Sequence, residues 1–162
     1  MDTTDISSTL GTLFGELVDG APATGAYILN AGDPGMLRSL DALSASAASV
    51  LTSTGSSIAA HVDHVRYGLS LMNRWSGEEN PFTDADWSAS WKKPTVTDAE
   101  WKQLRADLSD EAVRWMNVLR TPREVKAIEL NGMIGSIVHL AYHLGALRQI
   151  NSALRGPVEP TL

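Results

Sequence analysis

The chain has 162 residues, of which 43% are hydrophobic and 20% charged, a balance typical of one folded globular domain rather than a disordered chain. The 19 Asp and Glu residues outnumber the 13 Lys and Arg residues, and the net charge of −6 argues against a nucleic-acid binder and against docking on an anionic membrane. The chain has no cysteine, which excludes disulfides, thiolate metal ligands and a cysteine nucleophile. We predict a single domain over residues 1–162.

The start of the chain, MDTTD, is acidic where a signal peptide would be basic. No apolar run reaches the ~18 residues that a membrane-spanning helix needs. A lack of cysteine also fits a reducing compartment. We therefore expect a cytoplasmic protein with no membrane partner and no nucleic-acid partner.

The first third of the chain predicts one long helix and one short one. Apolar residues recur at helical spacing over 5–19, and Gly20 and Pro22 follow as stop signals. The turn-rich stretch 20–32 contains Tyr27-Ile28-Leu29 as its only apolar plug. Asp33 and Pro34 are typical of an N-cap and a first helical position, so a short helix is expected over 36–43.

Residues 44–57 are rich in Ser, Ala and Thr and predict a loop or a weak turn of helix. A second long helix is expected over 57–75, followed by an excursion over 78–94. In this excursion Trp87 and Trp91 lie four residues apart, so a short helix would place both indoles on one face, as a candidate lid or rim.

A third long helix is expected from the capping box Thr97-Asp98-Ala99-Glu100 to about Leu119, and a fourth over 130–154, before Gly156-Pro157. No convincing strand pattern occurs. Four long helices with short additional ones predict an all-α fold, a four-helix bundle with short extra helices.

The four histidines lie in two of these helices, His61 and His64 in the second and His139 and His143 in the last. Residues four apart on a helix lie on one face, so His139 and His143 can direct two imidazoles at one point, as in a metal-binding HxxxH pair. A third imidazole from another helix would complete a three-histidine site with positions open to water or substrate. The alternative is that the pair is structural, since this spacing is common by chance.

Residues 139–149, HLAYHLGALRQ, resemble the signature helix HxxYHLGxxRQ of the DinB-like (YfiT-like) four-helix-bundle superfamily. Residues 57–64, SIAAHVDH, are similar to the helix that carries this family's first ligand, a histidine seven residues after a Ser or Thr. Counting from Ser57 leads to His64. The order of helices and the long excursion after the second helix extend the similarity to most of the chain.

The resemblance implies a divalent transition metal, zinc or nickel, bound by His64, His139 and His143, with water completing the shell. It also implies a small-molecule substrate and a homodimer. Some relatives are isomerases or S-transferases that use a low-molecular-weight thiol such as mycothiol, bacillithiol or glutathione. The helical wheel places His61 nearer than His64 to the apolar stripe, so His61 could replace His64, be a fourth ligand, lie behind a ligand, or lie on the surface.

Other residues have two interpretations each. Asp63 could orient a ligand imidazole or be an exposed helix carboxylate. Glu129 could be a base or a carboxylate at a helix start. Arg148 could hold an anionic substrate or pair with an acid, and we favour the pairing. Trp87 and Trp91 could line a pocket or anchor the loop, and we favour anchoring. Tyr142 lies off the ligand face and is expected to pack against another helix or a dimer seam.

Three functions remain open at this point. The first is a metal-dependent enzyme that performs hydrolysis, isomerisation or thiol transfer. The second is a non-catalytic, stress-related binding module in which the metal is structural. The third is a helical bundle whose histidines are close by chance and bind no metal.

Overall fold

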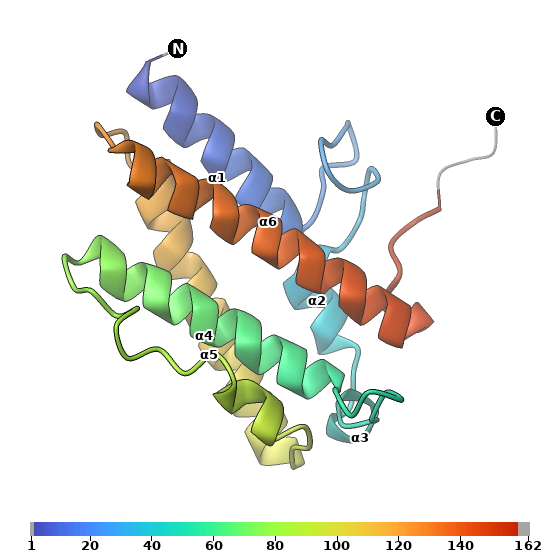
Figure 1. The fold of residues 1–162 in the computed structure, drawn as a ribbon. Helices are drawn as coiled ribbons and strands as arrows, with labels where there is room; N and C mark the ends of the chain where they lie inside the picture. Colours follow the sequence, from blue (N-terminus) through green and yellow to red (C-terminus); the bar gives the residue numbers. More distant parts are fainter. Residues whose placement is uncertain (1, 159–162) are drawn as a thin grey trace. The chain divides into compact units, whose positions relative to one another are not determined.

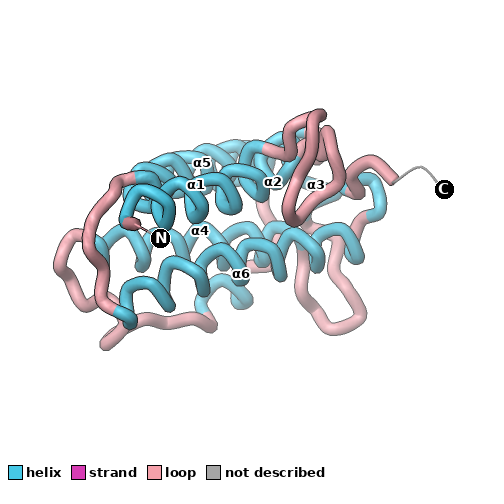
Figure 2. The backbone as a smooth tube through the Cα atoms, turned by 90° about the horizontal axis from the view of Figure 1, so that it is seen from above, coloured by secondary structure: helices cyan, strands magenta, loops and turns pink. Residues whose placement is uncertain are grey.

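The computed structural model describes residues 2–158 and divides the chain into two compact units, Met1–Ala42 with Leu119–Leu162, and Leu43–Val118. Over the described residues the secondary structure is helical, with turns and loops and no strand, which confirms the all-α class (Figure 2). The bundle arrangement and the single domain over 1–162 stay predictions, and Met1 and residues 159–162 lie outside the described part. No helix in this part is long and apolar enough to cross a membrane.

The first unit contains α1 (Thr3–Asp19), α2 (Gly35–Asp41), α6 (Ala127–Ile150) and the 3-10 helix η2 (Ser152–Leu154). Helix α1 packs beside both α2 and α6 (Figure 1). Their facing sides bury a shared apolar core, which includes Phe14, Leu17, Met36, Leu40, Leu140 and Leu147. Helix α1 begins two residues earlier than expected because Asp2 and Asp5 form a reciprocal capping box at its start.

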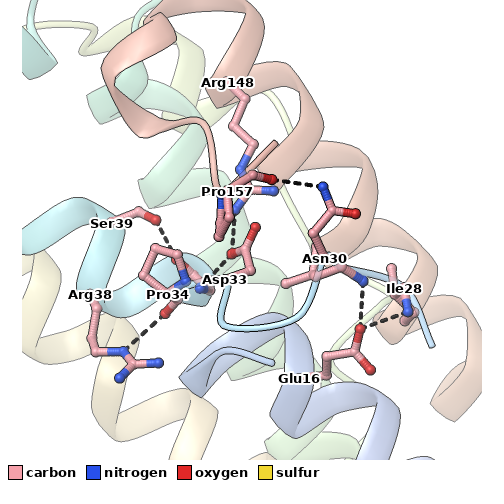
Figure 3. Close-up of polar contacts among 11 residues, drawn as sticks. Glu16, Ile28, Asn30, Asp33, Pro34, Arg38, Ser39, Arg148 and Pro157 are labelled. Carbon is pink, nitrogen blue, oxygen red and sulfur yellow. Dashed lines mark hydrogen bonds and ion pairs between the residues drawn. The ribbon is translucent and has the colours of Figure 1, made fainter. Parts of the chain in front are cut away.

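The predicted apolar plug in the loop after α1 is wrong. Tyr27 is 82% exposed and Ile28 is 43% exposed. The buried carboxylate of Glu16 instead organises this loop, because it accepts hydrogen bonds from the main-chain amides of Tyr27, Ile28 and Leu29 (Figure 3 shows Glu16 with Ile28). A carboxylate can be buried here because amide hydrogens satisfy its charge.

Asp33 is not the N-cap of α2, a position taken by Pro34. Its Oδ1 accepts a hydrogen bond from the Gly35 amide at 2.8 Å and pairs with Arg148 Nη2 of α6 at 2.6 Å (Figure 3). Asp33 is buried, and its carboxylate both accepts from the first amide of α2 and forms a tertiary ion pair. The pairing expected for Arg148 is confirmed.

The second unit contains α3 (Ala45–Ala48), α4 (Ile58–Ser76), the 3-10 helix η1 (Ala89–Lys92) and α5 (Asp98–Arg120) up to Val118. The Ser57 side chain caps α4 by accepting from the Ala60 amide at 3.1 Å. At the start of α5, Thr97 and Glu100 form the predicted capping box.

The segment between α4 and α5 is mostly loop. The only helical turn within its described residues is η1, which contains Trp91 but not Trp87. The expectation of one short helix carrying both indoles is therefore wrong, although η1 packs against α4. The prediction of a loop or a weak turn of helix over 44–57 is confirmed, with α3 as the single turn.

Candidate metal centre

Helix α6 brings His139 and His143 together, as the four-residue spacing predicts. Their Nε2 atoms are 3.0 Å apart, and the ring centroids are 4.5 Å apart with the ring planes nearly perpendicular. Buried residues of α6, including Ile137, Leu140 and Leu144, fix the face that this helix turns inward. His143 lies at the edge of that face and is buried, whereas His139 is half-buried.

The separation of the two Nε2 atoms is compatible with shared coordination. Two imidazole nitrogens that each lie about 2.0–2.1 Å from one ion are roughly 3 Å apart. Without an ion, the same separation requires one ring to donate a hydrogen bond to the other. The geometry of the pair therefore fits a metal, and it does not identify which metal.

His64 lies in the second turn of α4 and is buried, with only 9% of its surface exposed. Its position follows from Ser57, which ends the preceding loop and sets the first residue of α4. Among the residues that the structure describes, one group of metal-ligating side chains could hold an ion, and it consists of His64, His139 and His143. One ligand atom from each of the three lies within 4.8 Å of the other two.

The surroundings of His64 favour the neutral imidazole, which is the form that binds metals. Burial lowers the pKa of His64, while the charge of Asp63 and a hydrogen bond to the main-chain carbonyl of Trp87 act in the opposite direction. A carbonyl that accepts from one ring nitrogen orients the ring and leaves the other nitrogen for a metal. The main-chain carbonyl of Trp87 can thus orient the His64 ring for metal binding.

His61 is half-buried and is not in the three-histidine group. Its ring stands edge-on to Trp91, with centroids 5.0 Å apart. Burial lowers the pKa of His61, and the charge of His64 lowers it further. Of the interpretations left open for His61, these contacts agree best with a residue that lies behind the ligand His64 and does not bind the metal itself.

The other polar candidates have structural partners. Asp63 forms an ion pair with Arg66 at 2.8 Å. Glu129 accepts from the Lys126 amide at the start of α6 and pairs with Arg123, and these interactions lower its pKa. These contacts favour the interpretation of Asp63 and Glu129 as ordinary helix carboxylates over a role of either residue in the metal site.

Three aromatic contacts of the site could not be deduced from the histidine spacing. Trp91 and Trp87 lie against His64, with ring centroids 4.9 and 5.7 Å away. Tyr142 stands edge-on to the ring of its sequence neighbour His143 at 5.1 Å while 69% of its surface is exposed, and its packing against another helix or a dimer seam stays a prediction. Tyr67 contacts Trp87, and its position three residues after His64 on α4 was the available signal.

Comparisons with protein-family models, with curated proteins and with solved structures yield no match to this chain.

Proposed function

We propose that the chain binds one divalent transition metal, zinc or nickel, through His64, His139 and His143. The observation that carries this proposal is the three-histidine group with ligand atoms within 4.8 Å of one another. Two of the three imidazoles are buried, and burial lowers the pKa of His64, so the ligands need little deprotonation at neutral pH. Imidazole suits zinc, nickel, copper and iron, so the choice of metal rests on the family resemblance.

We also propose that the chain is a member of the DinB-like superfamily with its four-helix-bundle arrangement. The support is the motif of residues 139–149, which lies on α6, and Ser57, which caps α4 seven residues before His64. The four long helices α1, α4, α5 and α6 have the expected order along the chain.

The reaction we propose is that of a metal-dependent enzyme acting on a small molecule, with a low-molecular-weight thiol as co-substrate. A bound divalent ion would supply Lewis acidity, which lowers the pKa of a bound water or thiol. Asp63 and Glu129 are engaged in ion pairs, so they do not support a hydrolase with a dedicated carboxylate base. Thiol transfer needs no such base, because the co-substrate brings its own nucleophile.

The ion pairs of Asp63 and Glu129 leave neither carboxylate as an evident catalytic base. This observation equally favours a second candidate, a non-catalytic, stress-related module of the same fold. In that case the metal would stabilise the fold, and its removal would change the free energy of unfolding but no reaction rate. Glutathione and bacillithiol transfer assays, each run with and without a chelator, separate the two candidates. Transfer that stops on chelation and returns with zinc or nickel identifies the enzyme.

The metal site itself is tested by mass spectrometry of bound metals on protein purified without a histidine tag. We expect close to one equivalent in the wild type and a strong loss in His64→Ala, His139→Ala and His143→Ala. His61→Ala is the matched control, since it removes a histidine of the same helix from outside the group. Metal absent from the wild type, or lost only in His61→Ala, would refute the assignment.

A homodimer is part of the same proposal. Ile134, Val138 and Tyr142 follow one another at four-residue intervals on α6 and are 46%, 61% and 69% exposed. Such a stripe is typical of a surface that a partner covers. Sedimentation of the wild type and of Val138→Glu tests it, with a dimer expected only for the wild type. A cytoplasmic location is proposed from the resemblance and from the absence of cysteine.

A further inference from the structure

Two large aromatic side chains of the second unit flank the candidate ligand His64. The indole of Trp91 is tilted by 33° from the His64 ring at a centroid distance of 4.9 Å, close to a stacked arrangement. The indole of Trp87 lies 5.7 Å from the same ring. Both distances are within the range of direct aromatic contact. The two indoles therefore border the position at which His64 would bind a metal.

The loop that carries the indoles is held in place from several directions. The Asp86 amide donates to Tyr67 Oη at 3.1 Å, and the ring of Tyr67 stands edge-on to Trp87. The Asp86 carboxylate accepts from the Ser88 amide at 2.9 Å and pairs with Lys92 at 3.1 Å. The orientation of the indoles is thus set by the protein before any ligand binds, which lowers the entropic cost of binding.

Loop anchoring alone does not account for these two residues. Trp87 is 42% exposed and Trp91 is 37% exposed, so each leaves a large apolar area in water. The start of the same loop is already anchored by Phe82, whose ring packs against Trp75 of α4 at 5.8 Å. Two preorganised, partly exposed indoles beside a metal ligand have the features of a small-molecule site, which combines an apolar wall with few polar groups.

We propose that Trp87 and Trp91 form an aromatic platform that determines specificity by binding the flat, apolar part of a small ligand whose donor atom binds the metal held at His64. This inference rests on the proposed metal site. The ligand class is a small molecule with an anionic oxygen or sulfur donor next to an aromatic or otherwise planar apolar group. The platform contributes affinity for that group, and the metal contributes affinity for the donor.

The test uses two hydroxamates with the same metal-binding head, benzohydroxamate and acetohydroxamate, which differ in the aromatic ring. Binding of each to the zinc-loaded full chain is measured by calorimetry, and zinc content is measured in the same samples afterwards. We expect the wild type to prefer benzohydroxamate. Each of Trp87→Leu and Trp91→Leu should reduce the ratio of the two affinities by about 2- to 12-fold, the size of one aromatic contact.

The matched control is Tyr27→Leu, which removes an 82% exposed aromatic ring from the loop after α1, outside the segment that carries the two indoles. It should keep the wild-type ratio. Trp91→Phe, a variant that retains an aromatic ring, should keep most of the preference. If Trp91→Leu does not fold, Trp87→Leu tests the expected loss. In the wild type, benzohydroxamate should also change the tryptophan emission while acetohydroxamate does not.

The outcomes separate the two proposals. A wild type that takes up no zinc overturns the metal site and the platform with it. A wild type that holds zinc and binds both hydroxamates with a ratio that neither tryptophan replacement alters overturns the platform alone. A ratio that Tyr27→Leu lowers as much as Trp91→Leu does also overturns the platform, because the preference would then not depend on the position of the aromatic ring.

Discussion

Replacing Arg148 with methionine should destabilise the chain more than any surface substitution, because it leaves the charge of Asp33 buried without its partner. Asp33 is 2% exposed, the Arg148 side chain is 16% exposed, and their atoms are 2.6 Å apart (Figure 3). Breaking a buried ion pair by removing one partner costs about 3–5 kcal/mol. The Gly35 amide still donates to Asp33 Oδ1, so we expect the lower half of that range.

A loss of about 3–4 kcal/mol is large beside the ~5–15 kcal/mol that stabilises an ordinary domain. The double variant Asp33→Asn/Arg148→Met should recover most of the loss, because asparagine keeps an acceptor for the Gly35 amide and removes the unpaired charge. The Arg148 Nε makes no hydrogen bond among the described residues. The intact pair therefore offsets its own desolvation incompletely, which is why its joint removal is inexpensive.

Urea unfolding followed by far-UV circular dichroism measures these differences, and the four proteins form a double-mutant cycle. Arg74→Met is the matched control, since Arg74 pairs with Glu79 in an ion pair whose side chains are 49% and 56% exposed. We expect the control to leave the unfolding midpoint unchanged. The reasoning is refuted if Arg148→Met costs less than about 1 kcal/mol, below the range for a buried pair, or if the double variant is as unstable as the sum of the single ones.

Glu16→Gln should lower the free energy of unfolding by about 1–3 kcal/mol, because it weakens charge-assisted hydrogen bonds to three loop amides. Chymotrypsin should then cleave faster after the exposed Tyr27. Unchanged cleavage after Tyr27 would contradict this role of Glu16. Gly156→Ala should cost about 1–3 kcal/mol in urea unfolding, since its Cβ would collide with the buried carboxylate of Asp33, which the ion pair with Arg148 holds in place. A neutral result would contradict this packing. Without metal, stability should fall as pH decreases through about 6.5, the ordinary histidine pKa: the pKa values of His61 and His64 are lowered in the fold, so the unfolded chain binds protons first. The double replacement of both histidines by glutamine should flatten this dependence in unfolding curves at pH 5 to 8, and an equally steep curve would refute it.

The long helices were predictable because their signals are local. The cap at Ser57 and the box at Thr97 and Glu100 fix the starts of α4 and α5 within a residue of the expectation. Each of these signals requires only residues within one turn of the helix start. The helix ends were less accurate, and α6 ends at Ile150, four residues before the predicted end, because the last residues form η2 instead.

The loops were not predictable from local pattern, since their partners lie far away in sequence. Asp33 followed by Pro34 has the local pattern of an N-cap, and its carboxylate does accept from the Gly35 amide, but it also pairs with Arg148, 115 residues later. Tyr27 and its neighbours have the pattern of an apolar plug, yet the carboxylate of Glu16 binds their amides and leaves the Tyr27 side chain in water. In both cases a buried carboxylate determines the conformation of the loop. The local sequence pattern does not reveal whether a charged residue is buried.

The choice between His61 and His64 shows what a helical wheel can decide about a site. The wheel ranks residues by their angle to the apolar stripe, and on that measure His61 ranks higher. Both rings contact Trp91, so the two histidines share one side of α4. His64 is the one in the three-histidine group, because one of its ring nitrogens lies within 4.8 Å of ligand atoms of His139 and His143. The wheel therefore identifies the side of a helix on which a ligand lies, and selecting between two histidines on that side requires the distances among all the ligands.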